Sequence, residues 1–217
     1  MQAKAIVRQA RRMGLDMIGV CDHNSAENVA AVMKAGAREG LSVLAGMEIT
    51  ARQEVHILGL FENESDVMQM QDLVYENLSG ESDEESFGLQ TLVDDSDHVV
   101  GTNHRLLVGA TTLSVEQIIE AIHDRRGLAI ASHVDRERFS LTGRFGFIPK
   151  GLYLDAVEVG QPSSARRNYG YPVITSSDAH FLEDVGKSST SFLVEEPSLD
   201  EIRMALRGND GRKVVLS

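Results

Sequence analysis

The stretch MIGVCDHNSAEN, Met17–Asn28, decides how the rest of the sequence is interpreted. Four apolar residues and a cysteine lead into an acid and a base, Asp22 and His23, which stand side by side before a segment of helical pattern. A short, continuously apolar run is typical of a strand buried on both faces of a parallel sheet. Asn24, with Glu27 three residues later, is a candidate N-cap for the next helix. The sequence therefore predicts a buried strand that ends on a charged pair.

Strand and helix patterns alternate along most of the chain. Strands are expected at 15–23, 41–51, 54–61, 128–136, 156–160, 171–180 and 213–217, and helices at 3–13, 24–40, 65–78, 114–127 and 198–208. This alternation predicts an α/β fold with a parallel sheet, either doubly wound or closed into a barrel. Residues 79–112 are acidic and rich in turn residues, which predicts an inserted loop or hairpin within a single domain of residues 1–217.

Composition and charge narrow the functional classes. The net charge of -12 predicts no general nucleic-acid or anionic-membrane binding, because the mean field repels phosphates, although a bound metal can invert that field locally. The single cysteine, Cys21, excludes an intrachain disulfide and fits a reducing compartment. No apolar stretch approaches the roughly 20 residues that span a bilayer, and the N-terminus lacks a signal-peptide pattern. We therefore expect a cytoplasmic protein.

Potential metal ligands and acid–base groups gather near the ends of the predicted strands. They are Asp22, His23, Glu48, His56, His133, Asp178 and His180. In parallel α/β folds the carboxyl ends of the strands converge on one rim, so residues distant in sequence meet there. Imidazoles and carboxylates without a thiolate set suit zinc, manganese or iron. Each residue alone is more often a satisfied polar group, but buried charges are costly unless they are paired or metal-bound. The other histidines, His98, His104 and His123, are expected to be solvated.

Five segments in a fixed order resemble the motifs of the PHP (polymerase and histidinol phosphatase) phosphoesterases. They are GLDMIGVCDHNSAENV, GMEIT, EVHILGLF, ASHVDR and SSDAH, and the resemblance covers nearly the whole chain. It implies a distorted (β/α)7 barrel with up to three zinc or manganese ions, or iron, on its rim. It also implies that a metal-activated water hydrolyses a small phosphate ester, such as a metabolite or a nucleotide.

The resemblance implies a role for each ligand. The metal ligands would be His23, Glu48, His56, His133, Asp178 and His180. Glu48 would bridge two ions, and His56 with His133 would complete the set of one of them. Asp178 would serve a second ion, and His23 with His180 a third.

Catalytic and substrate-binding roles are expected for further residues. Asp22 would orient His23 or take a proton from the attacking water, unless it only caps the following helix; His180 is counted with the catalytic groups. Arg138 and Arg144 follow the His133 strand and are expected to hold phosphate oxygens, because guanidinium groups bind them in bidentate fashion. Arg136, Arg166 and Arg167 are weaker candidates for the same role.

One departure from the family pattern matters. The family begins with a strand ending in His-x-His, and this sequence has no His-x-His. The motif and its strand belong before Met1. A start at an internal methionine, a genuine short form, and a site completed by a second subunit all remain open. We expect this form to bind at least one transition metal but to turn over slowly, and to expose a barrel edge that could pair with a second copy in a homodimer.

Three functional classes remain. The first is the phosphoesterase, acting on a small phosphorylated substrate. The second is an amidohydrolase-like metal hydrolase, which also places His and Asp at barrel strand ends. The third is a degenerate, metal-stabilised domain with a structural or binding role, which the absent His-x-His favours.

Overall fold

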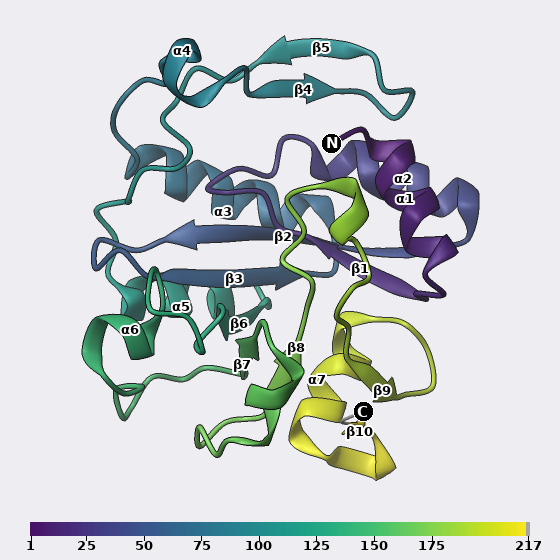
Figure 1. Cartoon of the computed structure of the whole chain (residues 1–217), viewed down its shortest axis with the longest axis vertical. Coiled ribbons are helices and arrows are strands. Elements are labelled where there is room, and N and C mark those ends of the chain that lie inside the picture. Colours follow the sequence, from purple (N-terminus) through teal and green to yellow (C-terminus); the bar gives the residue numbers. More distant parts are fainter. Residues whose placement is uncertain (216–217) are drawn as a thin grey trace.

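A six-stranded sheet runs through the middle of the molecule in the computed structural model, which describes residues 1–215 (Figure 1). The strand order is β1-β2-β3-β6-β7-β8. These strands are β1 (Met17–Val20), β2 (Ser42–Thr50), β3 (His56–Phe61), β6 (Leu128–Ala131), β7 (Ala156–Val159) and β8 (Val173–Thr175). The last expected strand, at 213–217, corresponds to Lys213–Val215 (β10), which is not part of this sheet. Positions 216 and 217 lie outside the described part of the chain.

Helices connect and cover the strands. The longer ones are α1 (Ala3–Arg12), α2 (Val29–Glu39), α3 (Glu64–Glu76), α5 (Val115–Asp124) and α7 (Leu199–Arg207). The shorter elements are α4 (Glu84–Phe87), α6 (Leu141–Phe145) and the 3-10 turns Pro162–Arg166, Leu182–Asp184 and Asn209–Gly211. Two small antiparallel ladders join β4 (Thr91–Val93) to β5 (Val99–Thr102) and β9 (Ser191–Leu193) to β10. No helix within residues 1–215 is long and apolar enough to cross a membrane.

Local sequence signals account for several helix ends. Helix α5 begins with a capping box in which Ser114 and Gln117 satisfy each other's backbone N–H groups. The predicted cap of α2 is wrong, because that helix begins five residues after Asn24. Asn24 is instead fully buried with a left-handed backbone (φ 48°), and its amide donates to the carbonyl oxygens of Leu107 and Gly109. It therefore ties the inserted segment to the end of β1.

The direction of one strand differs from the prediction of a parallel sheet. β1 with β2, β6 with β7 and β7 with β8 are parallel pairs, but β3 is antiparallel to both β2 and β6. A turn of a few residues joins β2 to β3, and such a short connection allows only antiparallel pairing. As a result, the first residues of β3 lie beside the last residues of β2 and β6, at one end of the strands.

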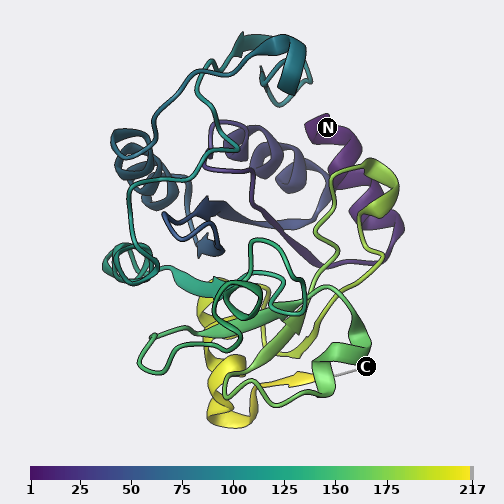
Figure 2. The ribbon, with the colours of Figure 1, turned by 60° about the vertical axis from the view of Figure 1, so that its left-hand side comes forward.

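The sheet curls into a half-barrel (Figure 2). Within residues 1–215 this sheet has six strands, with β1 and β8 at its two edges, and its curled α/β form is consistent with the distorted barrel that the family resemblance implied. The acidic segment at 79–112 contains α4 and the β4–β5 hairpin, which lies beyond α2 (Figure 1). Asn28 of the α2 N-terminus fastens this hairpin by hydrogen bonds to Thr91 and Val93.

Alternation along the strands divides the sheet into two faces. Successive side chains of a strand point to opposite sides. Met47 and Ile49 of β2 pack on the outer face with α1, α2, α3 and α5, whereas Leu44 packs on the inner face with Leu128 and helix α7. Glu48 shares the parity of Leu44. The apolar core and the polar end of the inner face therefore lie on the same strands.

His123 is not the solvated side chain that its sequence position suggested. Its Nε2 lies 2.9 Å from Oδ2 of Asp155, a carboxylate that also accepts the backbone N–H of Ala129. Burial would raise the pKa of Asp155, but the hydrogen bonds from His123 and Ala129 hold it below its usual range. The ionised carboxylate joins α5 to the start of β6, at the end of the sheet opposite Glu48.

Candidate metal centre

Five strands bring polar side chains to one end of the inner face. Glu48 is near the end of β2, and His23 pairs with it just beyond β1. His56 begins the antiparallel strand β3, directly opposite Thr50. Ser132 and His133 follow β6, and Asp178 follows β8. Because β3 is antiparallel to its neighbours, its first residue lies at the rim where the other strands end.

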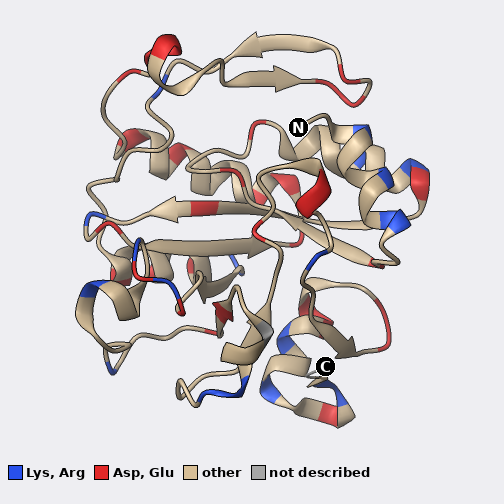
Figure 3. Cartoon of the chain, viewed as in Figure 1, with Lys and Arg blue, Asp and Glu red and all other residues tan. Residues whose placement is uncertain are grey.

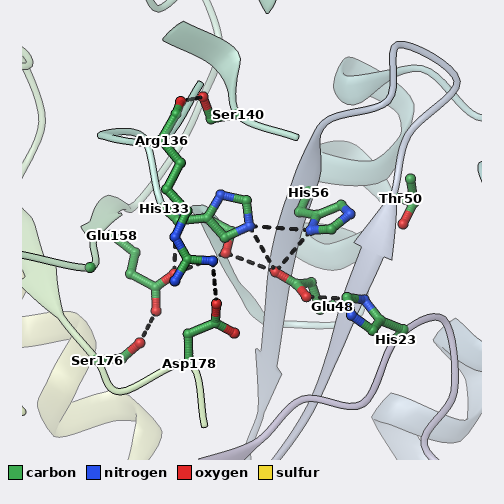
Figure 4. A network of polar contacts seen from close by, with 12 residues as sticks. His23, Glu48, Thr50, His56, His133, Arg136, Ser140, Glu158, Ser176 and Asp178 are labelled. Carbon is green, nitrogen blue, oxygen red and sulfur yellow. Dashed lines mark hydrogen bonds and ion pairs between the residues drawn. The ribbon is translucent and has the colours of Figure 1, made fainter. Parts of the chain in front are cut away.

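Glu48 is the centre of the group (Figure 4). Its Oε1 lies 3.3 Å from Nδ1 of His56 and 3.5 Å from Nε2 of His133, and these two nitrogens are 3.2 Å apart. Its Oε2 lies 3.1 Å from Nδ1 of His23. Glu48, His56 and His133 are buried. The two carboxylate oxygens therefore face different imidazoles.

The triangle formed by Glu48 Oε1 and two imidazole nitrogens fits a divalent cation. Ligand atoms bound at 2.0–2.1 Å to a tetrahedral zinc ion are roughly 3.3–3.4 Å apart, close to the three edges of 3.2, 3.3 and 3.5 Å. His23 adds a third imidazole, and one ligand atom each from His23, Glu48 and His56 lie within 4.8 Å of one another. The other ring nitrogen of His133, Nδ1, is buried without a hydrogen-bond partner in the described chain.

The protonation states also suit a metal. Burial would raise the pKa of Glu48, but hydrogen bonds from His133 and His56 and the charges of His56 and His23 hold it well below its usual range. Burial lowers the pKa of His23, against the opposing effect of Glu48. At neutral pH the cluster therefore offers an ionised carboxylate and a neutral imidazole, the forms that bind cations. Burial and nearby carboxylates raise the pKa of the Cys21 thiol, which leaves it protonated.

Glu158 of β7 belongs to this network of contacts, and the sequence analysis did not identify it. Its Oε2 accepts the hydroxyl of Ser132 at 2.9 Å and the backbone N–H of His133 at 3.1 Å, and its Oε1 accepts the hydroxyl of Ser176. Ser132 also lies 2.8 Å from Glu48 Oε1. The signal was an acid inside the apolar strand AVEV, since a buried carboxylate needs partners.

The backbone at His133 explains how its ring reaches the cluster. Ser132 points to the inner face, so an extended strand would send the next side chain to the outer face. His133 instead has a left-handed backbone (φ 31°), and its N–H is held by Glu158. This turn brings the ring back to Glu48.

Asp178 and His180 lie at the margin of the cluster. Oδ2 of Asp178 is 2.6 Å from Nη1 of Arg136, whose side chain is 48% exposed (Figure 4). The exposed ring of His180 is 5.9 Å from that of His23, centroid to centroid, and its Nδ1 contacts the backbone oxygen of Asp178 at 2.9 Å. In this structure Asp178 is the counter-ion of an arginine.

Asp22 does not point toward the other predicted residues, and its expected role beside His23 stays a prediction. Neighbouring residues of an extended strand point to opposite faces, and only His23 pairs with Glu48. Asp22 instead lines a pocket of about 340 Å³ with residues of α1, α2 and the β4–β5 hairpin. It also does not cap α2, which begins seven residues later.

The two predicted phosphate-binding arginines form no hydrogen bond or ion pair with the cluster in the described chain. Nη1 of Arg144 is 3.8 Å from Oε2 of Glu54, and both side chains are exposed. Arg138 is exposed as well. Among the arginines that follow β6, Arg136 is the one that reaches a predicted ligand. The sequence placed all three on one loop but did not show which side chain turns inward.

Comparison with known proteins places these residues in context. The model of the PHP domain matches residues 1–143, and the PHP-associated model matches residues 163–210. Over 105 residues the chain is 30% identical to the uncharacterized protein YqxK of Bacillus subtilis (strain 168), a match covering 43% of this chain and 27% of YqxK.

Solved structures share the fold. The lesion-specific endonuclease PfuEndoQ from Pyrococcus furiosus superposes with a TM-score of 0.72 at 18% identity, over 99% of this chain and 53% of that chain. Endonuclease Q in complex with a 27-mer duplex substrate, with an abasic lesion at the active site, gives 0.69 at 19% identity, over 96% and 52%. The chain therefore spans about half the length of these endonucleases.

These structures overturn one prediction. The prediction that excluded nucleic-acid binding was wrong, because endonuclease Q, a protein of this fold, binds a DNA duplex substrate with an abasic lesion at its active site. Net charge describes a mean field, whereas cations and arginines reverse the field locally. The charges are also unevenly spread, with basic residues gathered on α1 and near α7 (Figure 3).

The PHP domain model covers well over half of the sequence, and its span contains four residues of the cluster, His23, Glu48, His56 and His133. The segment beyond it matches the region that accompanies this domain. The chain therefore belongs to the PHP domain family.

Proposed function

We propose that this chain carries the hydrolytic centre of a metal-dependent phosphoesterase and acts on phosphodiester bonds of nucleic acid. The observation that carries the proposal is the buried triangle of Glu48 Oε1, His56 Nδ1 and His133 Nε2, with edges suited to a divalent ion. The shared fold with endonuclease Q supports the choice of nucleic acid. Because the chain spans about half of those proteins, the proposal concerns this centre and not a whole enzyme.

The residues divide the work as follows. Glu48, His56 and His133 would hold one ion, and the second oxygen of Glu48 with His23 and Asp178 would hold another. Bound ions would activate water and neutralise charge on the phosphate. Glu158 would fix the orientation of His133, since groups that hydrogen-bond to a ligand set its geometry.

Arginines and one histidine would handle the substrate. Arg136 would hold an oxygen of the scissile phosphate in place of Asp178, because a guanidinium matches two phosphate oxygens. Arg138 and Arg144 are exposed and would contact neighbouring phosphates. His180 is exposed beside His23. It would donate a proton to the leaving oxygen and then take up a proton from solvent.

The test is hydrolysis of a labelled single-stranded oligonucleotide in manganese or zinc. Wild type and Glu120→Gln, an exposed position on α5, should cleave it, whereas Glu48→Gln should lose at least about 100-fold of the rate. Equal rates in all three would overturn the proposal. Release of phosphate from a mononucleotide, without cleavage of the oligonucleotide, would favour a small ester. Metal binding without either reaction would favour a structural role.

A further inference from the structure

Phe139 has one ring face against the candidate metal centre, and nearly half of the residue is exposed. Its ring stacks on His56 with centroids 4.9 Å apart and planes 12° from parallel. The residue is nevertheless 47% exposed and belongs to neither apolar cluster of the described chain. Because His56 covers one ring face, the exposed area belongs to the rest of this side chain.

The backbone holds this ring in place at a cost in free energy. Phe139 has a left-handed conformation (φ 57°), which bulky residues rarely adopt and which clusters at ligand-binding sites. Its carbonyl accepts the backbone N–H of His56 at 2.9 Å. The next residue, Ser140, is fully buried, donates to the carbonyl of Arg136 at 2.5 Å and accepts the N–H of Gly143 at 2.9 Å. The hydrogen bonds of Phe139 and Ser140 thus hold the backbone in place while the apolar ring stays partly exposed.

The same loop carries two arginines, together with the acids Asp135 and Glu137. Arg136 reaches Asp178 at the margin of the cluster, and Arg138 is exposed next to Phe139. A flat aromatic face beside guanidinium groups is the combination with which proteins bind single-stranded nucleic acid, because each base has a π-face and each linkage a negative charge. An apolar ring offered only for packing would be expected to lie within one of the clusters.

We infer that Phe139 stacks on the base of the nucleotide next to the scissile phosphate, and thereby selects esters that carry an unstacked base. The inference rests on the proposed function and adds a specificity-determining residue to it. It requires a base that is free of its neighbours, as in a single strand or a base turned out of a duplex. The phosphate at the centre and the base on Phe139 would then share one substrate.

The test compares two single-stranded oligonucleotides of equal length, one with ordinary bases and one with abasic residues around the cleavage point. The measured quantity is the ratio of kcat/KM for the base-bearing strand to that for the abasic strand. Phe139→Leu keeps the bulk but loses the π-face and should lower this ratio about 5- to 150-fold. Phe139→Tyr should keep the ratio. Phe147→Leu, a change at a 62% exposed aromatic of the same segment, should leave it as in wild type.

A role limited to positioning His56 predicts a different result. Phe139→Leu would then slow both strands equally and leave the ratio unchanged, which would overturn the inference. Fluorescence anisotropy of the same strands in EDTA separates this outcome from failure of the proposed function. Tighter binding of the base-bearing strand by wild type, lost in Phe139→Leu, supports stacking even without hydrolysis. Equal binding of the two strands by wild type refutes it.

Discussion

Glu48→Gln should abolish most of the stabilisation that a divalent metal gives this protein. Glutamine has nearly the same volume and keeps one oxygen that can accept from His56, His133 and Ser132. It lacks the charge that a cation needs, and its amide cannot bridge two ions. The variant therefore removes the proposed metal site with little change in packing.

The expected magnitude follows from binding linkage. At a free metal concentration of 100 times the dissociation constant, the metal stabilises the folded state by about 2.7 kcal/mol. For a chain of this size each kcal/mol raises Tm by about 2–4 °C, so wild type should gain about 5–11 °C. Loss of groups that only support a metal ligand weakens binding about 10- to 100-fold. If the loss is 100-fold, the variant should gain about 0.4 kcal/mol, or 1–2 °C.

Far-UV circular dichroism is the suitable assay because the chain has no tryptophan. Each protein is melted in EDTA and again with zinc or manganese, and the quantity compared is the metal-induced change in Tm. This choice removes any effect of the substitution on the metal-free fold. Glu120→Gln, at an exposed position of α5, changes the net charge equally and should show the full wild-type gain.

Two results would refute the reasoning. An equal metal-induced gain in wild type and Glu48→Gln would mean that the metal binds elsewhere. The absence of any gain in wild type, with no metal retained after dialysis at neutral pH, would mean that the buried triangle binds no cation.

Three further changes test the site and the fold. Glu158→Gln should weaken metal binding about 10- to 100-fold in a zinc titration, because the hydrogen bonds that orient His133 lose their charged acceptor; wild-type affinity would contradict this. Asp155→Asn should destabilise the protein at pH 7 by about 1–3 kcal/mol in urea unfolding. The pKa of Asp155 is depressed by folding, so this difference is complete above its unfolded pKa and should shrink as pH falls through the folded pKa; a difference independent of pH would contradict it. Gly46→Ala should lower the free energy of unfolding by about 1–3 kcal/mol, because the added Cβ would lie 2.8 Å from the carbonyl oxygen of Val20. An unchanged Tm would show that β1 and β2 move apart without loss of stability.

The convergence of the main candidate ligands could be predicted from the sequence because strand geometry is local. Apolar runs gave the strands, and an acid or imidazole near each end gave Glu48, His23 and His133. His56 was predicted to reach the same rim, although the expected parallel direction of its strand was wrong. The short β2–β3 turn makes that strand antiparallel, so its first residue, and not its last, lies at the rim.

Features that depend on tertiary contacts could not be predicted. The direction of Asp22 follows from the register of β1 against β2, which a single strand does not encode. The choice of Arg136 over Arg138 and Arg144 depends on the path of a loop. Glu158 is recognisable only once Ser132 and the backbone of His133 are known to face it. Sequence patterns indicate which strand or loop carries a side chain, whereas the direction of that side chain depends on its tertiary contacts.

The register of β2 links the stability of the fold to the chemistry of the site. Leu44 and Glu48 lie on one face of this strand, with Leu44 in the core beneath α7 and Glu48 among the imidazoles. A shift of one residue would turn Glu48 to the outer face, bring Met47 among the imidazoles and remove Leu44 from the core. Such a shift is opposed by the apolar contacts of Leu44 and by the contacts of Glu48 with the three imidazoles. The core beneath α7 therefore holds the candidate metal ligands in register, and a core variant that loses metal binding without unfolding would be evidence of a register change.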